Sequence, residues 1–190
     1  MFSMGADLMG TADNCSPVSK AHFSNEASIS FYCLSDETPY IFLKSKIFEY
    51  VFTDQALIKI ERDNAAGVKQ YVRRYDWQTS FISDVRFETP GAGMTDYACE
   101  IKFILANQEF SIDIVKAEIA TARIYYSILL KLSREQHQNS MKLRRAESLL
   151  TNNMINEKNI GQIAIDAANV LQSLSPISYK HIFESLDAYK

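Results

Sequence analysis

Two neighbouring segments with a strict period of two constrain the fold of this chain more than any other feature. Apolar side chains occupy every second position on both sides of the short turn Ala106-Asn107-Gln108: Cys99, Ile101, Phe103 and Leu105 before it, and Phe110, Ile112 and Ile114 after it. Such a period places all of them on one face of an antiparallel hairpin, and a slip of one residue would turn the whole row to water. The sequence therefore predicts a sheet with one buried face.

The same period recurs upstream, in strands expected over residues 46–52, 56–61, 69–77 and 81–88. Phe48, Tyr50 and Phe52 share one face of the first, and Thr53-Asp54-Gln55 makes a turn into the second. In the last strand, Phe81, Val85 and Phe87 are expected to form the apolar face, with Ile82 on the opposite face. The stretch Thr89-Pro90-Gly91-Ala92-Gly93 must end this strand, because proline cannot donate to a ladder.

The period changes to about 3.6 near Lys116, which predicts a helix that closes the sheet. Its apolar stripe contains Ile119, Ala122, Tyr126, Leu129 and Leu130. The fold class expected is mainly β (α+β): a bent antiparallel sheet or barrel of six or seven strands, capped by a C-terminal helix and followed by an α-helical extension.

Three regions are predicted along the 190 residues: 1–39, a leader that is poorly ordered or partly helical; 40–133, the sheet domain; and 134–190, a helical extension. Residues 29–43 are ambiguous between a short helix and an extra strand. The polar run 134–140 either links or continues the helix into solvent. The extension packs either on the sheet domain or on another copy of the chain, because about fifty residues bury little core alone.

Composition excludes several classes of function. A net charge of −3 gives no general electrostatic attraction to nucleic acid. No apolar run reaches the roughly 18 to 20 residues that span a bilayer, and the first residues do not resemble a signal peptide, so a cytoplasmic location is expected. Three widely spaced cysteines, Cys15, Cys33 and Cys99, argue against a disulfide framework or a zinc cluster.

No catalytic, metal-binding or cofactor-binding residue is expected, and the chain is interpreted as a non-enzyme. The three histidines, His22, His137 and His181, lie outside the sheet domain and are interpreted as surface residues. The acidic residues Asp96, Glu100, Asp113 and Glu118 raise the question of paired-carboxylate catalysis. Cross-strand ion pairs on a solvated face explain them more simply, because Glu100, Lys102 and Asp113 lie on the polar faces of their strands.

One strand carries the candidate interaction surface, which consists of Tyr71, Arg73, Arg74, Tyr75 and Trp77. Aromatic residues and arginine are enriched at protein interfaces. The alternative is that Tyr71, Tyr75 and Trp77 belong to the core. A second candidate surface is basic, and such residues could attract anionic lipid head groups. It consists of Lys69, Arg73 and Arg74 on the same strand and of Lys44, Lys46, Lys59 and Arg62 from earlier elements.

Several segments resemble the bacterial pleckstrin-homology (PH-like) domain family, of the kind also found in YvbH-like bacterial proteins, over about residues 40–133. The run from Phe48 to Ile58 resembles its strand, Phe-Thr turn and aliphatic strand. The stretch from Ile82 to Gly91 resembles its Glu-Thr-Ala-Gly segment, and Asp96 to Phe103 resembles its Asp-x-x-x-Glu-(Ile/Leu)-Lys strand. The resemblance implies a non-enzymatic cytoplasmic domain, and some relatives form ring-like homo-oligomers.

Together these observations predict a binding or assembly module that mediates protein–protein contacts and forms a homo-oligomer, through strand edges or through the helices after Ser133. The partner is not identified by the sequence. The alternative prediction is a membrane-peripheral module that binds anionic lipid head groups. The third hypothesis is an enzyme.

Overall fold

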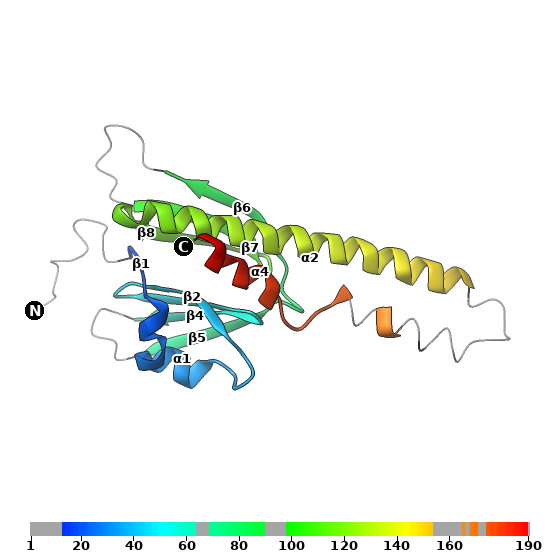
Figure 1. The fold of residues 1–190 in the computed structure, drawn as a ribbon, viewed down its shortest axis with the longest axis horizontal. Coiled ribbons are helices and arrows are strands. Elements are labelled where there is room, and N and C mark those ends of the chain that lie inside the picture. The colour runs from blue at the N-terminus through cyan, green and yellow to red at the C-terminus, as the bar shows by residue number, and fades with distance from the viewer. Residues whose placement is uncertain are drawn as a thin grey trace, which may run out of the picture.

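Two antiparallel sheets form the centre of the computed structural model, which describes residues 13–63, 69–89, 98–153, 165, 168–170 and 174–189. The first has five strands in the order β1 (Ser16–Pro17), β2 (Pro39–Lys44), β3 (Phe48–Thr53), β4 (Ala56–Arg62) and β5 (Gln70–Asp76). The second has three strands, in the order β6 (Ile82–Glu88), β7 (Ala98–Leu105) and β8 (Gln108–Val115). Figure 1 shows the long helix α2 (Ile119–Asn153) running over the second sheet and beyond both sheets.

The β7–β8 hairpin confirms the register predicted from its alternating residues. Ile101 lies opposite Ile112, and Phe103 lies opposite Phe110 with their rings stacked 5.0 Å apart. Ala106 and Asn107 form the turn, and both have positive φ angles, of 51° and 62°. Two successive left-handed residues give the turn a twist that matches the twist of the flanking strands.

The main core lies between the two sheets and contains the alternating residues of β3, β7 and β8. Trp77, Phe52 and Phe103 meet at its centre, with the ring of Phe52 6.5 Å from that of Trp77 and 6.3 Å from that of Phe103. Apolar side chains from α2 complete it on one side: Ala122, Ile128, Leu129 and Leu132. The predicted role of α2 in closing the core is therefore confirmed.

The outer face of the five-stranded sheet is also buried. Phe42, Val51 and Ile58 form a second cluster there, beneath Phe23. The covering elements are the 3₁₀ helix η2 (Lys20–Asn25) and α1 (Ala27–Tyr32). The ambiguous stretch 29–43 thus holds both alternatives, since it includes the end of α1 and most of β2.

The described strands form two open sheets, not a closed barrel. At one corner, the Cys15 amide donates to the Asp113 carbonyl (2.7 Å) and the Val115 amide donates to the Cys15 carbonyl (3.0 Å). Ser16, the next residue, pairs with Lys44 of β2. The N-terminal segment therefore links β8 to β2, whereas β5 and β6 end their sheets without pairing to each other.

The predicted faces of β6 are wrong at its beginning. Phe81 is 51% exposed, whereas Ile82 is buried in the core at 2%. The register of β6 against β7 shifts between Ser83 and Arg86, where Asp84 has a φ of 49°. Such a bulge adds one residue to the strand and reverses the alternation, so that Val85 and Phe87 pack inward as expected.

Helix α2 follows the 3₁₀ turn η3 (Lys116–Glu118) and passes through residues 133–140 without a break. Of the two alternatives for that polar run, the helix is the one observed. Its first part does not extend into solvent, because Gln136 is 1% exposed. The Gln136 amide donates to the carbonyls of Trp77 (2.9 Å) and Ser80 (3.2 Å) and accepts from the Ile82 amide (2.9 Å).

The C-terminal residues return to the sheets and complete the main core. They form α4 (Lys180–Glu184) and the 3₁₀ helix η5 (Ser185–Tyr189), and they bury Tyr179, Ile182, Phe183 and Leu186. The ring of Phe183 stacks 5.6 Å from that of Tyr40 and 6.4 Å from that of Trp77. This part of the predicted helical extension packs on the sheet body, whereas residues 154–164, 166–167, 171–173 and 190 of it lie outside the described residues.

Candidate interaction surfaces

The structure divides the predicted interaction surface on β5 between core and surface. Trp77 has no exposed area, and its indole N–H donates to the Thr53 carbonyl (3.0 Å). Tyr75 is 8% exposed, and its hydroxyl lies 2.9 Å from the Gln108 side-chain oxygen. These two residues are therefore core residues, as the alternative interpretation held.

Tyr71, Arg73 and Arg74 remain accessible on β5, although Arg74 is already engaged. Its guanidinium donates to Glu37 (2.8 Å) and to Asp76 (2.7 Å). Partial burial lowers the pKa of Arg74, but these carboxylate contacts outweigh burial and raise the pKa above its usual value. Tyr71 is 47% exposed and Arg73 is exposed, so these two residues are what remains accessible of the predicted interaction surface.

A buried polar cluster around the β3–β4 turn holds three distant segments together. Glu37, whose side chain is fully buried, accepts hydrogen bonds from the Thr53 hydroxyl, Arg74 and the Leu34 amide. In the same turn, Asp54 accepts from the Thr38 amide (2.7 Å) and the Ser178 hydroxyl (2.6 Å). Sequence reasoning missed this cluster, because Glu37, Arg74 and Ser178 are far apart in the chain and form no motif.

Most of the predicted basic surface is neutralised by carboxylates. Lys44 contacts Glu26 (2.7 Å), Lys59 contacts Glu61 (3.2 Å), and Arg62 contacts the buried Glu49. Within the described residues, three predicted cations have no carboxylate at ion-pair distance: Lys46, Lys69 and Arg73. The ammonium group of Lys69 lies 4.9 Å from the ring centre of Tyr71 instead.

The carboxylates considered for catalysis do not form a pair in a pocket. Glu100 contacts Lys102 (2.9 Å) and accepts from the Ser111 hydroxyl; Lys102 also contacts Glu88 (2.8 Å). Burial raises the pKa of Glu100, but these contacts outweigh it and hold the pKa below its usual value, which favours the ionised form. The contact of Lys102 on β7 with Glu88 on β6 confirms a cross-strand ion pair on this face, whereas Glu100 pairs with Lys102 of its own strand. Asp96 lies outside the described residues.

The remaining chemical groups offer little for catalysis or metal binding. His22, His137 and His181 are exposed, as predicted, and His181 lies 2.9 Å from Glu135. Burial raises the pKa of the Cys15 thiol to about 12, which keeps the thiol protonated. Across the described ranges, no three ligand-type side chains are placed to hold a metal ion, and no helix is long and apolar enough to cross a membrane.

A groove of about 490 Å³ lies between the N-terminal segment, the start of α2 and η5. Lys20 contacts Asp187 there (3.4 Å) and lies 4.9 Å from the ring centre of Tyr40. Tyr125 lines the groove, and burial raises the pKa of its hydroxyl to about 12. The one basic side chain described in the wall of the groove, Lys20, is therefore already paired with a carboxylate of the chain itself.

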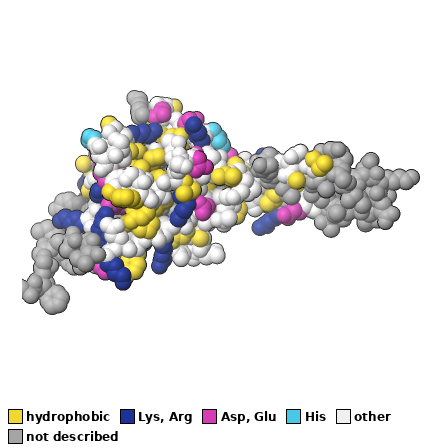
Figure 2. Space-filling model, turned by 90° about the horizontal axis from the view of Figure 1, so that it is seen from below, with side chains coloured by type: hydrophobic (Ala, Val, Ile, Leu, Met, Phe, Trp, Pro, Cys, Tyr) yellow, Lys and Arg dark blue, Asp and Glu magenta, His cyan; other side chains and the backbone are white. Residues whose placement is uncertain are grey.

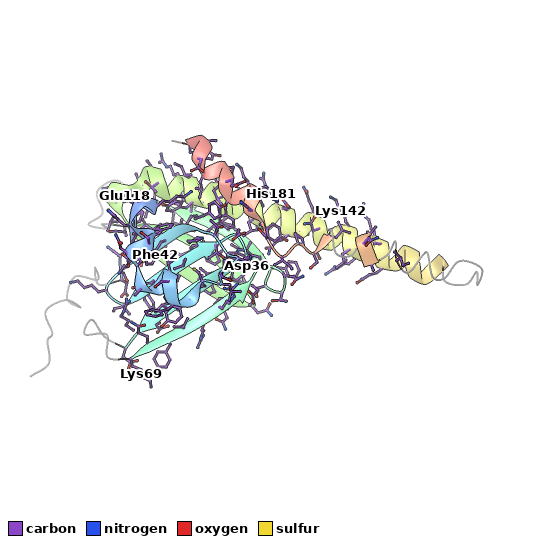
Figure 3. All side chains as sticks on the ribbon, turned by 60° about the horizontal axis from the view of Figure 1, so that its bottom comes forward. Asp36, Phe42, Lys69, Glu118, Lys142 and His181 are labelled. Carbon is purple, nitrogen blue, oxygen red and sulfur yellow. The ribbon has the colours of Figure 1, made fainter. Side chains whose placement is uncertain are left out.

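The far half of α2 forms the other candidate surface. After Gln136, none of the side chains described on this helix, up to residue 148, is buried. Met141 is 41% exposed, and on the segment that follows α2, Ile165 is 57% and Ile177 61% exposed. Figure 3 shows Lys142 on this projecting part of the helix, well away from Phe42 and the sheets.

Comparison with known proteins gives a consistent family assignment. Residues 5–133 match the model of the "Bacterial PH domain" family. The chain is 31% identical over 148 residues to the uncharacterized protein YvbH of Bacillus subtilis strain 168, covering 77% of this chain and 72% of YvbH. The crystal structure of a PH-domain-containing protein from Exiguobacterium sibiricum superposes with a TM-score of 0.79 at 25% identity, covering 92% of this chain and 99% of that one.

Proposed function

Because the chain belongs to the bacterial PH domain family, we propose that it is a non-enzymatic binding and assembly module that self-associates through its helical extension after Ser133. Family membership supports a domain that binds without catalysis. The evidence for self-association comes from the extension itself. Its first part is the far half of α2, which projects beyond the sheets.

The projecting half of α2 carries this proposal. Residues 137–153 would extend roughly 25 Å at 1.5 Å per residue, and the side chains described there are exposed or only partly buried. Helices in proteins are stabilised chiefly by packing one face against other elements. Exposed apolar side chains such as Met141 and Ile177 therefore favour an arrangement in which several copies of the extension pack together.

The test compares the native mass of two proteins by size-exclusion chromatography with light scattering. One is the full chain of 21.6 kDa, for which we expect a defined multiple of that mass. In the other, residues 141–174 are replaced by a flexible Gly-Ser linker of about eight residues, since a hydrogen bond between Asn139 and Tyr179 already holds the two ends close together. This variant keeps α4 and η5 in the core, which a truncation at Gln136 would remove.

We expect the linker variant to have the mass of one chain and to keep the β-sheet signal in circular dichroism. A full chain that stays at 21.6 kDa over a wide range of concentrations would contradict self-association. If the linker variant contains as many copies per assembly as the full chain, the extension is not the part through which the copies associate.

The alternative proposal, binding of anionic lipid head groups, is favoured by one observation. Lys46 and Lys69 lie on the β2–β3 and β4–β5 connections, which leave the same end of the five-stranded sheet. Flotation with phosphatidylserine vesicles tests it. If the full chain floats with the vesicles, and Lys46→Glu with Lys69→Glu abolishes flotation, the lipid proposal is supported over assembly alone.

A further inference from the structure

The groove between the N-terminal segment, the start of α2 and η5 has the size of a small-molecule site. Its volume of about 490 Å³ falls within the range of ligand pockets, roughly 300 to 1,000 Å³. Figure 3 shows Glu118, which lines the groove, at the end of the molecule opposite to Lys142 on the projecting half of α2. Tyrosines and apolar side chains form much of the wall: Tyr40, Tyr125, Tyr189, Val18, Ile124 and Leu186. Such a wall suits a ligand with an apolar body.

The charged groups in the wall of the groove leave one carboxylate without a cation. Lys20, the basic residue described there, contacts Asp187 (3.4 Å). Glu118 accepts a hydrogen bond from the Thr121 hydroxyl (2.9 Å), and no described Lys, Arg or His lies at ion-pair distance from it. By contrast, Figure 2 shows several Lys and Arg side chains around the hydrophobic ones on the face of α1 and β5. The groove therefore attracts positive charge.

Two tyrosine rings of the groove already hold ammonium groups of the chain itself. The ammonium of Lys20 lies 4.9 Å from the ring centre of Tyr40, and that of Lys131 lies 5.4 Å from the ring centre of Tyr189. Cations bind the faces of aromatic rings because the ring quadrupole is negative there. Among the described residues, no cation lies over the ring of Tyr125. That ring is therefore available to a cation from outside.

The carboxylate of Glu118 lies close to Tyr125 and makes this part of the groove negative. Burial raises the pKa of the Tyr125 hydroxyl to about 12, and the charge of Glu118 adds to this shift. At Tyr40, burial and then nearby carboxylates, with Glu184 first among them, also raise the pKa of the hydroxyl. Because a negative charge disfavours the ionised phenol, both tyrosines lie in a negative electrostatic potential.

We propose that this groove binds a small organic cation, in which an ammonium group on an apolar body lies between Glu118 and the ring of Tyr125. Lys20 uses the same combination of a ring and a carboxylate within the chain. Its contact with Asp187 is weak, because both side chains are exposed (38% and 54%), so a ligand can compete with it. The inference is independent of self-association, since the projecting half of α2 does not line the groove.

Saturation-transfer difference NMR with the full chain tests the inference with two matched probes. 2-Phenylethylamine carries an ammonium group near neutral pH, and 2-phenylethanol has the same shape without the charge. We expect the alcohol to bind at least about threefold more weakly than the amine, because only the ammonium attracts Glu118. Equal affinities would overturn the inference, since the groove would then recognise apolar shape alone. No binding of the amine at about 10 mM would also overturn it.

Glu118→Gln removes the charge and keeps an acceptor for the Thr121 hydroxyl. We expect its affinity for 2-phenylethylamine to fall about threefold to tenfold, and its affinity for 2-phenylethanol to stay unchanged. The matched control is Glu109→Gln, which removes an exposed carboxylate near the other end of β8, where it contacts Arg86 (3.2 Å). An equal loss in both variants would contradict a site at Glu118, because the attraction would then come from the overall charge of the protein.

A second substitution is expected to act in the opposite direction. Lys20→Met keeps the length of an exposed side chain but removes the ammonium that lies over the ring of Tyr40. The groove becomes more negative, so the affinity for 2-phenylethylamine should rise about twofold to fivefold. An unchanged or lower affinity would mean that Lys20 does not compete with the ligand, and it would reject the proposed site whatever the native mass of the protein.

Discussion

At the scale of single residues, burial decides what a side chain can do more than its chemical type. Tyr71 and Tyr75 occupy the same face of β5, yet Tyr71 is 47% exposed and Tyr75 is 8% exposed. The sequence could not show which of the two is buried, because both lie at alternate positions on the same face of one strand. What differs is the second sheet: Tyr75 lies against Phe110, with ring centres 5.4 Å apart, and Tyr71 has no such ring contact in the described residues.

Buried tyrosines predict a loss of stability at high pH. Burial raises the pKa of Tyr125 to about 12, and burial followed by nearby acidic groups raises the pKa of Tyr50 above its ordinary value. In the unfolded chain these hydroxyls ionise near pH 10. Since the folded pKa is the higher one, their contribution to stability is complete below pH 10 and falls as the pH rises. The contribution of Tyr125 is lost between pH 10 and about 12.

Absorbance at 295 nm during an alkaline titration checks this prediction. We expect the exposed tyrosines to ionise near pH 10, and the buried ones to ionise at higher pH, together with the loss of the β-sheet signal in circular dichroism. A single ionisation step near pH 10 with the fold intact would contradict the burial of Tyr50 and Tyr125.

At the scale of elements, alternation predicted most strands, and local backbone geometry accounts for the main error. The β7–β8 hairpin follows its alternation throughout, so its register is confirmed. In β6 the pattern of Phe81, Val85 and Phe87 suggested one continuous face, but Asp84 at φ 49° inserts a bulge. Nothing in the residue types there demands a positive φ, so the sequence alone gave no sign of the reversal.

The hairpin turn at Ala106 offers a stabilising substitution. Ala106 has a φ of 51°, a region that costs an L-residue with a β-carbon roughly 1–2 kcal/mol. Glycine removes that cost but loses more entropy on folding, so Ala106→Gly should raise the free energy of unfolding by about 0.5–1 kcal/mol. Urea denaturation measures it. Asn107→Gly is the control and should gain less, because asparagine visits this region readily; an equal or larger gain at Asn107 would contradict the turn geometry.

At the scale of the whole molecule, the core is completed by residues more than a hundred positions apart in the sequence. Phe183 stacks between Tyr40 and Trp77, and Asp54 accepts a hydrogen bond from the Ser178 hydroxyl. The sequence predicted only that residues 134–190 form a helical extension. It left open whether this extension packs on the sheets or on another copy, because periodicity carries no information about the partner surface.

This long-range packing makes the C-terminal segment a determinant of global stability. Phe183 has no exposed area, so Phe183→Ala should lower the free energy of unfolding by about 3–5 kcal/mol. The matched control is Ile177→Ala in the same segment, where the side chain is 61% exposed and the loss should be below about 1 kcal/mol.

Fluorescence of the single tryptophan, Trp77, follows both variants during urea denaturation. Since Phe183 lies 6.4 Å from the indole ring, its removal should also shift the native emission to longer wavelength, as water reaches the ring. Equal effects of the two substitutions would mean that the C-terminal segment does not cover Trp77. The linker variant proposed above depends on the same packing, because only a C-terminal segment that docks on its own sheets can keep the core closed when the projecting helix is removed.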